Sequence, residues 1–103
     1  MLAVATVTTW KAVPGKRNEV IQQFKEAKAI HERLGGRVRM WASGMAGPNF
    51  GTLTHVIVLD DMAALAKFGE KAQADPAWLK MVPSLYSDSP GTIVSHSQAV
   101  EIV

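Results

Sequence analysis

The sequence predicts an α+β fold of ferredoxin-like type, in which a four-stranded antiparallel sheet carries its helices on one side. Segments rich in β-branched residues alternate with segments of helical periodicity in the order β-α-β-β-α-β, which is the split βαβ arrangement. A chain of 103 residues, 48% of them hydrophobic, has room for one hydrophobic core, so we expect a single domain over residues 1–103.

The first third of the chain predicts a strand followed by a helix. Residues 2–13 are rich in Val, Thr and Trp and stop at Pro14-Gly15, as a strand would, and both faces of this strand are largely uncharged. Within residues 16–34 a stripe recurs at spacings of three and four, which indicates an amphipathic helix. The stripe consists of Val20, Phe24, Ala27, His31 and Leu34. Gly35-Gly36 is expected to end this helix with a left-handed cap.

The middle of the chain predicts a hairpin and a second helix. Residues 37–46 alternate in the manner of a strand, residues 47–51 form a loop, and Thr52–Leu59 is a strand rich in β-branched residues. Asp60-Asp61 then offers an N-cap to a helix with Leu65, Phe68 and Ala72 on one face.

The last part of the chain predicts a short helix and a final strand. Asp75 is a good capping residue and Pro76 suits the first helical position, so we expect a helix from Pro76 to about Val82. Residues 84–90 are expected to form a loop, and residues 91–103 the fourth strand.

The sheet face opposite the helices is expected to need a partner. Neutral and apolar side chains occupy that face on the first, second and last strands, and a monomer rarely leaves such a patch in water. Two copies that pack sheet to sheet would cover it, so we expect a homodimer.

Composition argues against several classes of function. The net charge of +2 is too small to indicate nucleic-acid binding, and the absence of cysteine excludes disulfides, thiolate catalysis and cysteine-bound zinc. The apolar start lacks the basic region of a signal peptide, and no apolar stretch reaches the length of a membrane helix. We therefore expect a cytoplasmic protein with no nucleic-acid or membrane partner.

Short motifs in residues 44–85, together with the Pro14-Gly15-Lys16 turn, resemble the dimeric α/β-barrel superfamily, most nearly the NIPSNAP-like proteins. These motifs are a Gly47-Pro48-Asn49 loop, His55 inside the third strand, and Asp75-Pro76-Ala77-Trp78 after the second helix. The resemblance implies a homodimeric barrel. The superfamily includes cofactor-free monooxygenases of quinol-like substrates, haem-degrading enzymes, isomerases and proteins without known activity, so the fold alone does not define a reaction.

Two histidines are the candidate catalytic residues. His31 takes an apolar position on the stripe of the first helix, and His55 shares its strand face with Leu53 and Ile57, so both can line a cleft between helix and sheet. A neutral imidazole in such a cleft is suited to act as a general base near pH 7. The alternative is that both histidines only pack in the core or at the dimer interface.

Aromatic and hydroxyl side chains are the candidate ligand-binding residues. Those expected in the cleft are Trp10, Phe68, Trp78, Thr6 and Thr8. Trp41 is a further candidate for stacking on a flat ligand, although each tryptophan can equally fill the core. His96, among polar residues of the last strand, is expected at a sheet edge or dimer seam. No metal site is expected, because the histidines lack a known ligand spacing.

Two functional hypotheses follow. In the first, the cleft of each protomer binds a small apolar or aromatic molecule, and the chain is a cofactor-independent monooxygenase or isomerase with His31 or His55 as base. In the second, the chain is a non-catalytic dimerisation or interaction module, which predicts a cavity below roughly 300 Å³.

Overall fold

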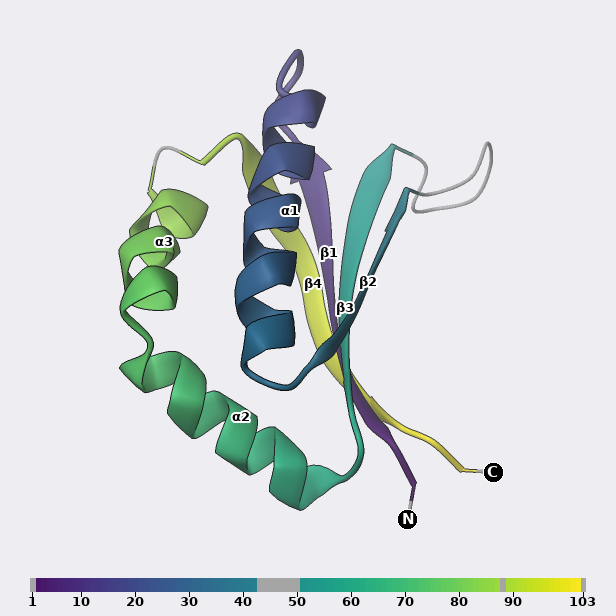
Figure 1. Cartoon of the computed structure of the whole chain (residues 1–103). Coiled ribbons are helices and arrows are strands. Elements are labelled where there is room, and N and C mark those ends of the chain that lie inside the picture. Colours follow the sequence, from purple (N-terminus) through teal and green to yellow (C-terminus); the bar gives the residue numbers. More distant parts are fainter. Residues whose placement is uncertain (1, 43–50, 88, 103) are drawn as a thin grey trace.

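The computed structural model describes residues 2–42, 51–87 and 89–102 (Figure 1). Along the chain, the elements are β1 (Val4–Ala12), α1 (Arg17–Arg33), β2 (Arg37–Ala42), β3 (Thr52–Leu59), α2 (Met62–Ala74), α3 (Pro76–Tyr86) and β4 (Gly91–Val100). The strands form one antiparallel sheet in the order β2-β3-β1-β4, with all three helices on the same side of it (Figure 1). The predicted ferredoxin-like α+β fold is confirmed.

Strand register decides which side chains face the helices. In the central pair, Thr8 lies opposite His55 and Trp10 opposite Leu53. Because alternate residues of a strand share a face, the even positions of β1 and the odd positions of β3 point to the helices. A register shift in the β1–β4 pairing occurs between Thr9 and Trp10. Both hydrophobic clusters of the core lie on the helix side of the sheet.

Helix α1 follows the predicted stripe. Val20, Phe24, Ala27 and His31 are buried, and the helix ends where Gly35 adopts a φ of 104°, as expected for a left-handed cap. The Gly36 amide then donates a hydrogen bond to the His31 carbonyl oxygen, with N and O 3.0 Å apart. This turn brings the chain back against the sheet at β2.

Gly36→Ala is expected to lower the free energy of unfolding. A Cβ atom at Gly36 would lie 2.8 Å from Ile57 Cγ2 and 3.2 Å from Phe68 Cε2, so the substitution should cost roughly 1 to 3 kcal/mol. Urea denaturation measures the difference. Gly69→Ala is the control, because a Cβ there meets nothing within 4 Å and alanine favours the helix. Equal stability of the two variants would contradict the close packing at Gly36.

Aspartates start the other two helices. Asp61 Oδ1 accepts the Ala64 amide at 2.7 Å and Asp75 Oδ2 accepts the Trp78 amide at 2.9 Å, so both predicted caps are confirmed. No helix in the described ranges is long and apolar enough to cross a membrane.

Helix α3 is longer than predicted. It continues to Tyr86 rather than ending near Val82, so residues 84–86 are helical and not part of a loop as expected. Pro83 removes one backbone donor but does not end the helix, since Met81 and Leu85 are buried on either side of it. Tertiary packing therefore keeps the helix continuous through Pro83.

Strands β1 and β4 are each shorter than expected by a few residues. Residues 43–50 and 103, which the expected second and fourth strands and the hairpin loop include, lie outside the described ranges.

The second face of the sheet has no cover from helices (Figure 1). Its central residues are apolar, with Val7 paired to Val56 and Ala5 to Val58. β2 adds Arg37, Arg39 and Trp41 at the edge of this face, and Trp41 is 60% exposed. Trp41 thus belongs neither to the core nor to the cleft, because its position in β2 has the opposite parity to the helix-facing residues. We call this surface the open sheet face.

Candidate functional site

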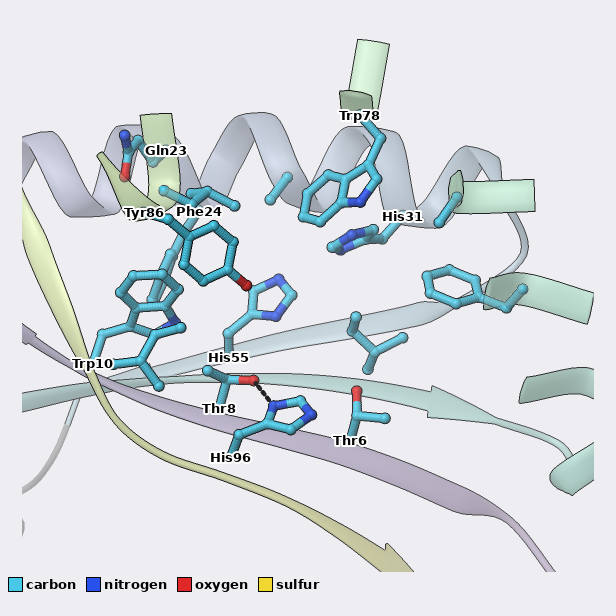
Figure 2. A pocket seen from close by; sticks show the side chains of 16 residues that line it. Thr6, Thr8, Trp10, Gln23, Phe24, His31, His55, Trp78, Tyr86 and His96 are labelled. Carbon is cyan, nitrogen blue, oxygen red and sulfur yellow. Dashed lines mark hydrogen bonds between the residues drawn. The ribbon is translucent and has the colours of Figure 1, made fainter. Parts of the chain in front are cut away.

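A cavity of about 380 Å³ lies between the sheet and helices α1, α2 and α3 (Figure 2). Its apolar wall is Trp10, Phe24, Ala27, Ile57, Phe68, Ala72, Trp78, Leu85 and Ile93. Its polar groups are Thr6, Thr8, Gln23, His31, His55, Tyr86 and His96. No Asp, Glu, Lys or Arg is among these lining residues.

The cavity contains every residue that the sequence suggested for the site except Trp41. His31 comes from α1, His55 from β3, and Thr6, Thr8 and Trp10 from β1. Phe68 comes from α2 and Trp78 from α3. Periodicity placed His31, His55 and Phe68 each on one face of its element. Their roles in binding or catalysis stay predictions.

The two buried histidines are adjacent at the centre of the cavity wall. His31 is 5% exposed and His55 7% exposed, and their ring centroids are 5.4 Å apart. His31 Nδ1 and His55 Nε2 are buried and have no hydrogen-bond partner among the described residues. Buried polar atoms are rarely left unpaired, so these nitrogens have unused capacity for a hydrogen bond to a ligand.

Burial keeps both imidazoles neutral. It lowers the pKa of His31 from 6.5 to about 4, and burial together with the nearby His31 lowers the pKa of His55 to about 4. A neutral imidazole has one N–H donor and one free acceptor nitrogen. At neutral pH the pair therefore offers donors and acceptors without adding charge to the cavity.

Aromatic rings enclose the histidine pair. The centroids of the Trp78 and His31 rings are 4.4 Å apart, with the two rings tilted by 54° (Figure 2). The centroid of the Phe68 ring lies 5.5 Å from that of His31. On the other side, Phe24 contacts His55 edge to face at 5.4 Å. This apolar surround excludes water from the rings and is the physical cause of their lowered pKa values.

An ion pair positions Trp78. Arg33 of α1 bonds to Asp75 at 2.8 Å, and the same carboxylate caps α3 by accepting the Trp78 amide. The Trp78 N–H, followed by the hydrogen bond from Arg33, holds the pKa of Asp75 below its usual value. Asp75 thus ties α3 to α1 at the residue whose ring covers His31.

His96 lies on the edge strand β4, as expected, and it also lines the cavity, which the sequence did not predict. Its Nδ1 lies 2.7 Å from Thr8 Oγ1 (Figure 2). Strand register places His96 on the cavity side of the sheet, because Thr8 pairs with His96 on one side and with His55 on the other. Strand pairing is a tertiary property, so alternation within β4 alone did not show it.

Tyr86 and Gln23 are further polar groups that sequence reasoning missed. Tyr86 lines the cavity yet is 71% exposed, so it lies at the mouth of the cavity. It is part of the site because α3 extends beyond its predicted end.

Within the described residues, no cluster of histidine and acidic side chains could hold a metal ion.

Comparisons of sequence find no match to this chain, either among protein-family models or among curated proteins. Solved structures do match. A NIPSNAP family protein from Agrobacterium tumefaciens has a TM-score of 0.74 at 16% identity, covering 98% of this chain and 85% of its own.

Two other solved structures are similar. An uncharacterized NIPSNAP domain protein from Burkholderia xenovorans has a TM-score of 0.72 at 20% identity, covering 97% of this chain and 93% of its own. SnoaB from Streptomyces nogalater, a cofactor-independent oxygenase, has a TM-score of 0.64 at 16% identity, covering 98% and 92%. The chain therefore has the ferredoxin-like fold of the NIPSNAP family proteins and of that oxygenase, as the resemblance in its sequence implied.

Proposed function

We propose that this chain acts as a homodimer in which each cavity binds a small aromatic molecule with a hydroxyl group and supports its oxygenation or isomerisation without a cofactor. The observation that carries the proposal is the pair of buried, neutral histidines with unpaired nitrogens, set in an apolar cavity. Fold similarity to a cofactor-independent oxygenase supports the reaction class at the level of architecture.

The lining of the cavity suggests the ligand class. Its volume of about 380 Å³ suits a small molecule, and its aromatic residues favour a flat ring. A carboxylate or phosphate would lack a Lys or Arg partner in this lining, and burying an unpaired charge is costly. A neutral ring with a hydroxyl group satisfies both the apolar wall and the histidine nitrogens.

The histidine pair supplies the base that takes the ligand's hydroxyl proton. In the proposed step, the free nitrogen of one imidazole accepts the ligand's hydroxyl proton, leaving an aromatic anion paired with an imidazolium. The attraction between these two charges offsets the low proton affinity of the buried ring. Because the rings are 5.4 Å apart, a charge on one disfavours a second charge on the other, so the second ring stays neutral and bonds to the ligand.

The resulting anion is electron-rich and can react in two ways. In oxygenation, dioxygen is the co-substrate and takes four electrons from the ligand: one oxygen atom becomes a carbonyl on the ring, replacing a C–H, and the other leaves as water. In isomerisation, the proton returns to a different atom of the ring. A positioned base typically contributes about 10² to 10⁴ in rate.

The open sheet face supports the homodimer. It holds Val7, Val56 and Val58 at its centre, and β4 is exposed along most of its length in a single chain. A second copy packed on this face would bury the valines and leave each helix-side cavity intact.

The exposed apolar face also favours the alternative, a non-catalytic interaction module. That alternative predicts a cavity below roughly 300 Å³, and the cavity is larger. The two proposals differ in whether the cavity takes a ligand.

Native mass spectrometry of the protein purified without refolding tests the proposal. We expect a dimer that retains a small molecule of aromatic composition. With that compound as substrate, His55→Gln and His31→Gln should lower turnover by about 10² to 10⁴ while the dimer persists. A dimer that never binds aromatic compounds would support the interaction module, and unchanged turnover in both variants would remove the histidines from the reaction.

A further inference from the structure

One row of side chains crosses the floor of the cavity from its buried centre to its exposed edge. Strand pairing places His55 of β3 opposite Thr8 of β1, and Thr8 opposite His96 of β4. All three line the cavity (Figure 2). His55 is 7% exposed, whereas His96 lies on an edge strand and is exposed. The row therefore joins the buried histidine pair to solvent.

The outer step of this row is already hydrogen-bonded. Thr8 Oγ1 and His96 Nδ1 are 2.7 Å apart, a short distance for a bond between a hydroxyl and a ring nitrogen. When His96 carries its proton on Nε2, Nδ1 accepts from the Thr8 hydroxyl, and the lone pairs of Thr8 Oγ1 remain free to accept from the cavity. Directly opposed residues on one sheet face have Cβ atoms roughly 5 Å apart, so one ligand oxygen can reach both His55 and Thr8.

We infer that Thr8 and His96 form a proton path that carries the ligand's hydroxyl proton out of the cavity to solvent. The inference rests on the proposed function, and it adds a route by which the site is reset. Neither residue replaces the histidine pair: His96 acts through Thr8 and is a positioning and relay residue.

The transfer balances as a chain of proton exchanges. A proton held by the ligand oxygen, or returned to it by His55, passes to Thr8 Oγ1 as an O–H bond forms there. At the same time Thr8 releases its original proton to His96 Nδ1. His96 then loses its Nε2 proton to water, and the imidazole is neutral again with its tautomer reversed. The exposed His96 ring then turns so that Nδ1–H meets water, which takes that proton while Nε2 gains one from water, and the ring and the Thr8 hydroxyl turn back to the starting arrangement.

Thr6 also places a hydroxyl group in the cavity, but it has no histidine beside it on β4. It points to the same face of β1 two residues away, and its neighbour on β4 is Gln98 rather than a histidine. An amide cannot take up and release a proton as an imidazole does. Of these two threonines, Thr8 is thus the one with a histidine beside it on β4.

The photoacid 2-naphthol tests the path, because it is a neutral aromatic alcohol whose emission separates the neutral from the ionised form. Excited in the cavity, it should transfer its proton and emit as naphtholate. Thr8→Val and His96→Gln should each lower the ratio of naphtholate to naphthol emission about tenfold, less than a full base contributes because the buried histidines remain. The double variant should be no worse than either single one, since both remove the same path.

Controls separate the path from structure and from binding. Thr8→Ser keeps the hydroxyl and should keep the ratio. Ser97→Ala, next to His96 in β4 but paired with Val7 on the open sheet face, should leave the ratio unchanged. Emission anisotropy reports binding independently. Bound naphthol with equal ratios in Thr8→Val, His96→Gln and the unaltered protein would overturn the path but leave the proposed function standing. Failure of the unaltered protein to bind 2-naphthol would overturn the phenolic ligand class, and the path with it.

Discussion

The free energy of unfolding is expected to fall by roughly 5 kcal/mol between pH 6.5 and pH 4 through the buried histidine pair alone. Burial lowers the pKa of His31 and of His55 to about 4 in the folded chain, while the unfolded chain keeps the ordinary value of 6.5. As the pH falls through this window the unfolded chain binds protons that the folded chain does not. The stability that neutral histidines contribute is thus present above pH 6.5 and lost toward pH 4.

Urea denaturation over this pH range measures the effect, and comparison with variants separates it from the titration of carboxylates. His55→Leu should flatten the pH dependence, and His31→Leu combined with it should flatten it further. Gln22→Ala is the control: it changes an exposed residue of α1 without adding or removing a titratable group, so the slope should be that of the unaltered protein. A double variant with the same slope as the unaltered protein would show that the cavity does not hold the histidines neutral.

Val56→Glu is expected to break the proposed homodimer. Val56 lies at the centre of the open sheet face, opposite Val7 of β1. In a symmetric dimer both carboxylates would be buried, each opposite Arg39 of its own chain. Burying these charges should cost a few kcal/mol even when they are paired, so the dissociation constant should rise at least about tenfold. Sedimentation velocity at a series of concentrations measures the change.

Val13→Glu serves as the control for charge, because Val13 lies beyond the end of β1 and is 39% exposed. It should leave the dimer unchanged. Val56→Glu should stay folded as a monomer, with the cavity on the far side of the sheet still able to bind 2-naphthol. If Val56→Glu remains a dimer at low concentration, the open sheet face is not the interface and the barrel arrangement is wrong.

Local pattern predicted most of the site. The stripe of α1 placed His31 beside Phe24 and Ala27, and alternation in β3 placed His55 on the same side as Leu53 and Ile57. Helical and strand periods are properties of consecutive residues, so a single sequence is enough to assign faces. Capping chemistry at Asp61 and Asp75 was equally local.

Local sequence pattern could not predict which distant segments pair in the folded chain. The sequence shows neither that Thr8 lies between His55 and His96 nor that the extension of α3 brings Tyr86 to the mouth of the cavity. Trp41 was a candidate both for stacking on a ligand and for the core, but strand register turns it to the open sheet face.

By itself, then, the sequence determined the order of elements, the buried faces of α1, α2 and β3, and two of the three histidines that meet in the cavity. The tertiary structure decided which elements adjoin, how large the cavity is, and that each of its two buried histidines is neutral and has one ring nitrogen without a partner among the described residues. The physical reason is that burial and electrostatic environment depend on atoms far apart in the chain, whereas periodicity and capping depend on neighbours within a few residues.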